Sequence, residues 1–261
     1  MSDGILMEMT IEEIRAFEPE VVVIGTGSVE PHGPVLPYGT DYYQADAVVR
    51  QGVILANKQG ARALMYPTLP IGNNVNFKAF PFACRIGVQT YMQVLLDIIS
   101  ALEEDGIRKI VLFDGHGGNT DTLRATLRAH CDKHKPGQGA FVCIMSCCPR
   151  SIMKPPLVED QSDHAGEMEV SMMMHIRKDL VREGKMGVFP WGPKPTVEAL
   201  GEDGIYFVKP WHIHVPASAG GDVRKASAEK GRKIIEAVAQ KLANLLVQLS
   251  KTPWSEKFPY T

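Results

Sequence analysis

Three groups of acidic and imidazole side chains are set among glycines and prolines, which are poor material for a core. They are Glu30, His32 and Asp41 in "GTGSVEPHGPVLPYGTDYYQAD", His116 in "DGHGGN", and His164 and Glu167 in "HAGE". Carboxylates and imidazoles gathered within a few ångströms would repel one another or lose hydration at high cost unless a cation supplied the counter-charge. Imidazole with carboxylate oxygen suits Zn²⁺, Mn²⁺ or Fe²⁺. These residue types therefore indicate a divalent metal centre.

Spacing within the first group is compatible with more than one ion. Glu30 and His32 are two residues apart, so in an extended segment they point to the same side and serve one metal or one each of two. Asp41 has two oxygens and could bridge two metals, as in two-metal hydrolytic sites. Each group alone also fits a polar turn or a helix cap. The prediction of a metal site depends on the three groups meeting in space.

Alternating strand and helix patterns predict how they meet. Strands are expected at 20–28, 61–72, 107–119 and 139–148, and helices at 41–60, 88–106, 120–134, 164–180 and 222–250, the last opened by Asp222 as N-cap. This order predicts right-handed βαβ crossovers and a mostly parallel sheet covered on both faces. In such α/β sheets ligands bind beyond the carboxyl ends of the strands. The first strand runs into Glu30 and the third into His116, and the helix that opens at His164 can face the same edge.

The remaining chain adds an irregular segment. Residues 186–216 are rich in proline, glycine and aromatic residues, and we expect an arm rather than a second domain, so that 1–261 form a single domain. Trp191 and Trp211 lie in this arm and could line a pocket.

Composition excludes several classes of function. The chain has 28 basic and 30 acidic residues with no dense basic block, which argues against a nucleic-acid partner. No signal peptide is evident and no apolar run reaches the ~18 residues of a membrane span. The five cysteines have no framework spacing, so we expect a cytoplasmic protein. "GTGSVE" lacks the third glycine of a dinucleotide fingerprint, and "GHGGNT" lacks the lysine of a P-loop.

Four blocks, in order along nearly the whole chain, resemble the signature of the creatininase family. "GSVEPHGPVLPYGTD" is similar to its G-S-x-E-x-H-G-P-x-L-P-x-G-T-D pattern, "DGHGGN" to N-G-H-G-G-N, "DHAGEMEVSMMM" to H-A-G-x-x-E-T-S, and "GGDVRKASAEKG" to G-D-P-x-x-A-T-x-E-x-G. The resemblance implies a three-layer α/β/α fold and two divalent metal ions, zinc or manganese, with iron as an alternative. It also implies a homo-hexamer built as a trimer of dimers, and a small-molecule substrate.

When the site residues of the family are carried over position by position, the resemblance implies the following roles. Glu30, Asp41 and His116 would bind one metal ion, and His32 and Asp41 would bind the other. His164 would stand near the substrate as an acid/base.

Two departures from creatininase itself bear on the site. Gly118 stands where creatininase has a glutamate that completes the second metal site, so we expect Glu167 to replace it as a ligand or to act as an acid/base. The tryptophans that creatininase places around creatinine are not evident beside His164, which argues against creatinine as the substrate.

The predicted activity is hydrolysis, in which a metal-activated water attacks a carbonyl of a small cyclic amide or related ring. The family also holds formamide hydrolases, a peptide-trimming peptidase and a hydrolase that opens a dehydro-inosose ring, and these stay open. A group of polar residues between the second and third predicted strands could line the path to the site and favours a hydroxylated, sugar-like ligand. We call this group the polar approach; its members are Asn73, Asn74, Asn76, Lys78 and Arg85. Two readings of other classes are a metal-dependent sugar or inositol isomerase, which would leave the substrate's mass unchanged, and a binding protein without turnover.

Overall fold

The computed structural model describes residues 3–135, 137–148, 152, 157–160, 162 and 164–260. At the centre of the described chain lies a sheet of four parallel strands in the order β2-β1-β3-β4. The strands are β1 (Val21–Thr26), β2 (Ala63–Leu69), β3 (Lys109–Asp114) and β4 (Phe141–Ser146). Each lies inside its predicted range, so the mostly parallel sheet is confirmed.

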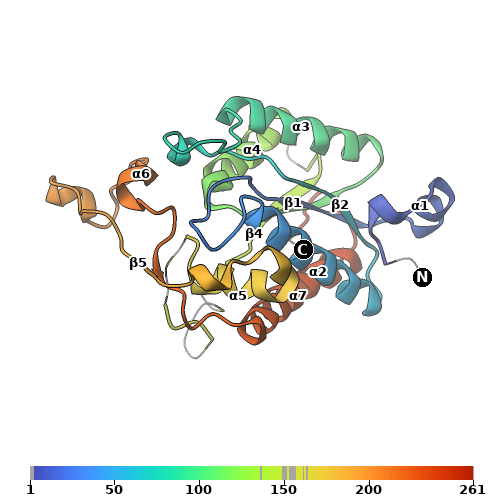
Figure 1. Cartoon of the computed structure of the whole chain (residues 1–261). Coiled ribbons are helices and arrows are strands. Elements are labelled where there is room, and N and C mark those ends of the chain that lie inside the picture. The colour runs from blue at the N-terminus through green and yellow to red at the C-terminus, as the bar shows by residue number, and fades with distance from the viewer. Residues whose placement is uncertain are drawn as a thin grey trace.

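Helices cover both faces of this sheet, with α3 and α4 on one side and α2, α5 and α7 on the other (Figure 1). The helices are α1 (Ile11–Phe17), α2 (Thr40–Lys58), α3 (Val88–Glu104), α4 (Thr120–Lys133), α5 (Glu167–Ile176), α6 (Trp211–His214) and α7 (Ala228–Lys251). Short 3₁₀ turns are η1 (Leu6–Glu8), η2 (Val75–Phe77), η3 (Gly117–Asn119), η4 (Lys178–Leu180), η5 (Glu183–Lys185) and η6 (Glu198–Gly201). The three-layer α/β/α fold is therefore confirmed.

Alternate residues of each strand feed two separate cores, because successive side chains of a strand point to opposite faces. Val21 and Val23 of β1 pack with α2 and α7, whereas Val22 and Ile24 pack with α3. Both cores consist mainly of buried aliphatic side chains. This two-sided burial holds the strand ends, and the loops that follow them, in fixed positions.

Two predicted helices had wrong boundaries. Asp222 does not open the last helix: it lies in β6 (Gly221–Asp222), which pairs antiparallel with β5 (Val188–Phe189). The helix begins at Ala228, and the Ser227 hydroxyl caps it by accepting a hydrogen bond from the Lys230 N–H. The helix predicted over 164–180 begins only at Glu167 and ends at Ile176.

The segment from 190 to 216 is mostly irregular, as predicted. It contains η6 and α6 and extends away from the sheet, on the left of Figure 1. No helix in the described part of the chain is long and apolar enough to cross a membrane.

Candidate metal centre

Carboxylates and imidazoles from four segments meet beyond the carboxyl ends of β1 and β3. The members of this carboxyl-edge cluster are Glu30, His32, Asp41, His116 and Glu169. Glu30 and His32 follow β1, Asp41 lies in the first turn of α2, His116 follows β3, and Glu169 lies in α5. The structure thus brings together the ligand candidates of the first two sequence groups. All but Glu169 are buried, and Glu169 is nearly so.

A tight fold of the loop after β1 places the first group. The Glu30 N–H donates to the Tyr38 carbonyl at 2.9 Å, and His32 pairs with Leu36 across an isolated bridge. At Gly33 φ is +64°, and a Cβ there would lie 2.6 Å from the Ala219 Cβ, so the turn requires glycine. The loop therefore returns at once to α2 and sets Asp41 beside His32.

Donor atoms of the cluster lie at ligand-like separations. His32 Nε2 is 3.0 Å from Asp41 Oδ1, and His116 Nδ1 is 3.0 Å from Asp41 Oδ2. His116 Nε2 is 3.2 Å from Glu30 Oε2, and His32 Nε2 is 3.9 Å from Glu169 Oε1. Asp41 thus stands between the two imidazoles, one oxygen toward each.

Buried polar atoms in this cluster lack ordinary partners. Neither His32 Nε2 nor Asp41 Oδ2 makes a hydrogen bond of ordinary geometry among the described residues, although each lies 3.0 Å from another atom of the cluster. No lysine or arginine pairs with Glu30 or Asp41 in the part of the chain that the structure describes. Buried polar atoms left unpaired cost free energy. Divalent cations would supply both the missing partners and the missing positive charge, so the donor set fits metal ions.

Backbone carbonyls fix the three imidazoles of the site. His32 Nδ1 lies 3.1 Å from the Glu30 carbonyl, His116 Nε2 lies 3.2 Å from the Asn73 carbonyl, and His164 Nε2 lies 3.1 Å from the Pro31 carbonyl. A carbonyl only accepts, so each of these nitrogens carries a hydrogen. The other ring nitrogen of His32 and of His164 faces the cluster, whereas both nitrogens of His116 lie beside its carboxylates. Metal-binding histidines are held in this way, with the second ring N–H donated to a carbonyl or carboxylate.

Charge in the cluster shifts the pKa values of its members in opposite directions. Burial disfavours the imidazolium of His32 and of His116, but the neighbouring carboxylates outweigh burial and raise the pKa of His32 to about 10 and that of His116 to about 9. Burial raises the pKa of Glu30, whereas His32 and His116 hold the pKa of Asp41 well below its usual range, against the effect of burial. The protein groups alone therefore retain protons that a metal ion must displace.

His164 differs from the other two imidazoles. Burial, reinforced by the positive charge of His32, lowers the pKa of His164 to about 3, so the ring is neutral. Its Nε2 also lies 3.3 Å from Ser218 Oγ, and the Ser218 hydroxyl donates to the Pro31 carbonyl at 2.6 Å. The Nδ1 lone pair is 3.7 Å from Glu30 Oε1. His164 thus presents a proton-accepting nitrogen to the edge of the cluster.

In the structure the side chain of Glu167 lies among other partners than the carboxyl-edge cluster. Its carboxylate pairs with Lys230 and accepts the N–H groups of Glu159 and Asp160 at 2.9 and 2.8 Å. Residues two apart on a helix are about 200° apart around its axis. Glu167 and Glu169 therefore point in different directions, and Glu169 is the one that α5 turns toward His32.

The position of Glu169 bears on Gly118, which stands where creatininase has a glutamate that completes the second metal site. A Cβ on Gly118 would lie 2.3 Å from His116 Nε2 and 2.4 Å from the Asn73 carbonyl, so this backbone has no room for a side chain there. In the pattern H-A-G-x-x-E the glutamate falls at position 169. The family pattern therefore matches Glu169, whereas the sequence-based expectation was Glu167.

Aromatic rings from the arm and from η2 surround His164. Trp211 stacks on the His164 ring at 5.8 Å between centroids, and Phe77 lies 5.0 Å from it. Trp211 also stacks on His214 at 5.2 Å, and His214 contacts Trp191. Trp191 and Trp211 were expected to lie in the arm, where they could line a pocket, and the arm carries Trp211 onto the His164 ring.

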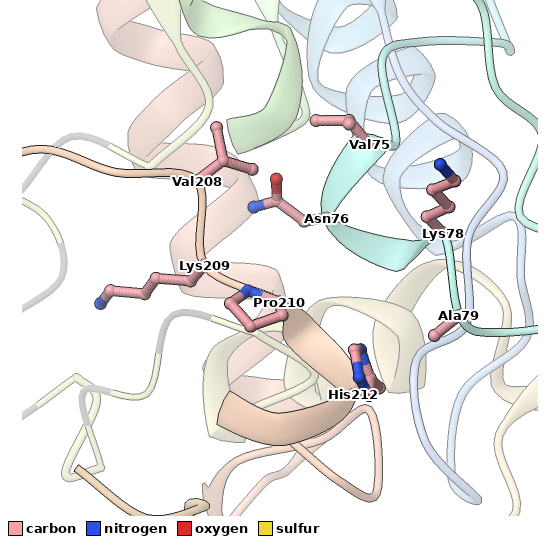
Figure 2. Close-up of a pocket in the computed structure, with 8 residues that line it drawn as sticks. All are labelled: Val75, Asn76, Lys78, Ala79, Val208, Lys209, Pro210 and His212. Carbon is pink, nitrogen blue, oxygen red and sulfur yellow. The ribbon is translucent and has the colours of Figure 1, made fainter. Parts of the chain in front are cut away.

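A cavity of about 300 Å³ opens between the same two segments. Figure 2 shows η2 and its neighbours facing the chain around Pro210 across this space. The lining residues are Val75, Asn76, Lys78, Ala79, Val208, Lys209, Pro210 and His212. The segments that line the cavity thus also place Phe77 and Trp211 on His164.

The predicted polar approach is only partly present. Asn76 and Lys78 line the cavity, but Asn73 and Asn74 are buried and serve the backbone. The Asn73 amide donates to the Ile86 carbonyl, and the Asn74 amide donates to the carbonyls of Val29 and Cys84. These two asparagines therefore hold the loop that supports His116, and the preference for a sugar-like ligand loses that support.

The parallel sheet and its two helical layers make this an α/β protein. The buried imidazoles and carboxylates lie at the carboxyl edge of the sheet, where proteins of this class bind their ligands. The chain belongs to the creatininase family of hydrolases: the family model described as creatinine amidohydrolase matches residues 7–246.

Two relatives cover most of the chain. A mycofactocin precursor peptide peptidase of Mycobacterium tuberculosis is 27% identical over 247 residues, which are 90% of this chain and 87% of the relative. A creatinine amidohydrolase of Pseudomonas putida is 25% identical over 260 residues, 92% of this chain and 91% of the relative. A 3-dehydro-scyllo-inosose hydrolase of Thermotoga maritima matches only 42% of this chain, at 25% identity, and 34% of its own length.

Solved structures agree with the fold. A candidate creatinine amidohydrolase from Bacteroides fragilis superposes with a TM-score of 0.85 at 26% identity and covers 97% of this chain and 99% of its own. A structure named creatininase Mn superposes with a TM-score of 0.76 at 23% identity, covering 96% of this chain and 100% of its own. These neighbours share the three-layer architecture.

Proposed function

We propose that the chain is a metal-dependent amidohydrolase that cleaves a carbon–nitrogen bond of a small, ring-containing substrate. The observation that carries this proposal is the carboxyl-edge cluster, in which buried atoms of His32 and Asp41 make no well-aligned hydrogen bond among the described residues. Such unpaired atoms are costly in a folded protein unless a bound group uses them.

Divalent metal ions would be held by this cluster. Glu30, Asp41 and His116 would hold one ion, and His32, Asp41 and Glu169 would hold the other. In each set, one ligand atom can be chosen from each residue so that the three atoms lie within 4.8 Å of one another. Zinc or manganese suits these donors, and the names of structural neighbours include manganese and zinc forms of creatininase. Such ions lower the pKa of water and stabilise negative charge on a carbonyl oxygen.

His164 would carry the proton. The ring is neutral and its Nε2–H is held by Pro31 and Ser218, so Nδ1 can accept a proton from the attacking water. The same nitrogen would then donate that proton to the leaving nitrogen as the carbon–nitrogen bond breaks. Oxygen from water ends on the carbonyl carbon, hydrogen ends on the amine, and His164 returns to its neutral form.

An amide is favoured over a carbon–carbon bond by the comparisons. The two relatives that cover about nine-tenths of the chain are, by name, a peptidase and an amidohydrolase, whereas the inosose hydrolase matches less than half. The rings of Phe77 and Trp211 beside His164 suit a flat substrate group. The cavity at the ends of η2 and α6 would receive the rest of the molecule.

Elemental analysis followed by a screen in heavy-oxygen water tests the proposal. Purified protein is analysed for metal and then incubated with lactams, formamides, short peptides and dehydro-inososes. We expect bound zinc or manganese, and one substrate class that gains one labelled water with an amide bond cleaved. A product of unchanged mass would indicate an isomerase, and a protein free of metal after growth with zinc and manganese would contradict the metal centre. The variant Asp203→Asn, at an exposed position of the arm, serves as the matched control for Asp41→Asn.

A further inference from the structure

A second group of imidazole and carboxylate side chains lies at the opposite edge of the sheet. Glu103 is in the last turn of α3, His130 is in the last turn of α4, and His134 follows that helix as its C-cap. The Glu103 carboxylate also accepts the N–H of Ala140, directly before β4. These three side chains form the amino-edge cluster, which is separated from the carboxyl-edge cluster by the length of the strands.

We propose that Glu103, His130 and His134 form a further divalent metal site, with zinc as the ion that suits it best, and that this site is structural and independent of hydrolysis. Two histidines and one glutamate are a known donor set for zinc. Nothing in the hydrolytic reaction uses these residues, since they lie away from His164 and from the cavity.

Donor geometry supports the site. His130 Nε2 lies 3.0 Å from Glu103 Oε1, and His134 Nε2 lies 3.5 Å from Glu103 Oε2. One donor atom from each residue can be chosen so that all three lie within 4.8 Å. Zinc bonds of about 2.0–2.1 Å put the ligand atoms of a tetrahedral site roughly 3.3 Å apart. The observed separations are of that size, so an ion could enter with small side-chain movements.

The positions of the two histidines are fixed by the chain. Residues four apart on a helix lie on the same face, and the two imidazole rings are 4.7 Å apart between centroids. At Gly139 φ is +77°, and a Cβ there would lie 2.7 Å from the His134 ring. The backbone after α4 therefore approaches His134 so closely that only glycine fits, and it holds the ring over Glu103.

Local charge favours a cation at this place. The C-terminal ends of α3 and α4 carry the partial negative charge of the helix dipole, and Glu103 adds a full one. In the described chain no lysine or arginine forms an ion pair with Glu103; its ionic partners are His130 and His134. A permanent positive charge is thus missing where two helix ends and a carboxylate converge.

The cluster is also open to solvent on one side. The side chain of His130 is 5% exposed and that of Glu103 is 13% exposed, but that of His134 is 30% exposed. An ion can therefore arrive from solution beside His134, and water can complete its coordination. A bound ion would tie α3, α4 and the start of β4 together and stabilise the fold.

Zinc titration of the full-length protein tests the site. Wild type, His134→Ala and Glu103→Gln are stripped with a chelator, loaded with Zn²⁺, desalted and analysed for zinc per chain. The exposed His175→Ala is the matched control, because it removes a histidine outside both clusters. We expect wild type and the control to retain one more equivalent of zinc than the two cluster variants, and zinc to raise the midpoint of thermal unfolding more in wild type than in those variants.

Equal zinc retention in all four proteins would overturn the proposal, as would an equal thermal shift. Circular dichroism shows whether each variant is folded. His134→Ala is the variant least prone to misfold, because His134 is the most exposed member of the cluster. Loss of zinc from the amino-edge cluster with hydrolysis intact would separate this site from the proposed catalytic one. Failure of the hydrolytic proposal would leave unaffected the difference of one zinc equivalent between wild type and the cluster variants.

Discussion

The carboxyl-edge and amino-edge clusters use the same side chains, glutamate and histidine, in opposite ways. At the carboxyl edge, buried atoms of His32 and Asp41 make no well-aligned hydrogen bond among the described residues. At the amino edge, Glu103 accepts from His130 and from the Ala140 N–H, and the cluster reaches solvent. The carboxyl-edge cluster needs a bound group to complete its hydrogen bonds, whereas the hydrogen bonds of Glu103 in the amino-edge cluster are made by the protein itself.

This difference indicates which cluster the fold maintains at a cost. Unpaired buried donors and acceptors lower stability, so a chain retains them where they serve a function. They lie in the loop after β1 and in the first turn of α2, next to strand ends that the sheet holds rigidly. The amino-edge cluster lies on helix ends and would add stability when it binds an ion. Loss of the first should abolish activity, whereas loss of the second should affect only stability.

The largest expected effect is a loss of turnover when the carboxyl-edge cluster is changed but not when the amino-edge cluster is changed. Asp41→Asn removes the carboxylate that faces both imidazoles, so both metal ions should be lost. Each ion is worth several kcal/mol of transition-state stabilisation, and we expect turnover to fall by roughly 10⁵-fold or more. Glu103→Gln should leave turnover close to that of wild type, because Glu103 lies at the opposite edge of the sheet from the reacting groups. Steady-state rates with metal analysis check this, and equal losses in both variants would remove the distinction.

A second prediction concerns a residue that works beside the cluster without binding metal. His164→Ala should lower kcat by about 10²- to 10⁴-fold, the usual worth of a general acid/base, while metal content stays at the wild-type level. His175→Ala, at an exposed histidine outside both clusters and the cavity, is the matched control. Loss of metal from His164→Ala would make His164 a ligand instead.

A third prediction compares two glutamates on one helix. Glu169→Gln should lower metal content and reduce activity by about 10- to 100-fold, if Glu169 contributes to one ion. Glu167→Gln should leave metal content unchanged and lower the free energy of unfolding by about 1.5–3 kcal/mol, because a buried charge-assisted pair with Lys230 is weakened. Denaturant unfolding and elemental analysis of both variants decide the assignment, and the reverse pattern would restore the role predicted for Glu167.

The smallest effect is a dependence of metal uptake on pH. The pKa of His32, raised to about 10, and that of His116, raised to about 9, mean that both rings carry protons at pH 7 before metal binds. Metal ions bind the unprotonated ring, so uptake should release protons and affinity should rise as pH rises toward 9. Titration calorimetry in two buffers of different ionisation enthalpy measures the release. A binding heat independent of the buffer would contradict these protonation states.

Much of this architecture could be predicted from patterns along the chain. The strands of the sheet are apolar runs bounded by glycine and proline, and Glu30, His32, Asp41 and His116 were found because each directly follows a strand or opens the next helix. Helix α1 was missed although Thr10 and Glu13 form a capping box, a signal that the sequence carries.

Other features depend on geometry that spacing does not reveal. Glu169 and Glu167 differ only in helical phase, and the correct phase follows from where α5 begins. Trp211 lies 47 residues beyond His164, and only the path of the arm brings the two rings together. Asp222 resembles an N-cap, but its strand pairing with β5 prevails over that local preference.

Anomalous X-ray scattering from crystals grown with manganese or zinc tests the central claim most directly. The account predicts strong anomalous peaks among Glu30, His32, Asp41, His116 and Glu169, with Asp41 contacting more than one of them. Crystals that diffract well but show no peak at this edge, with His32 Nε2 and Asp41 still 3.0 Å apart, would contradict it.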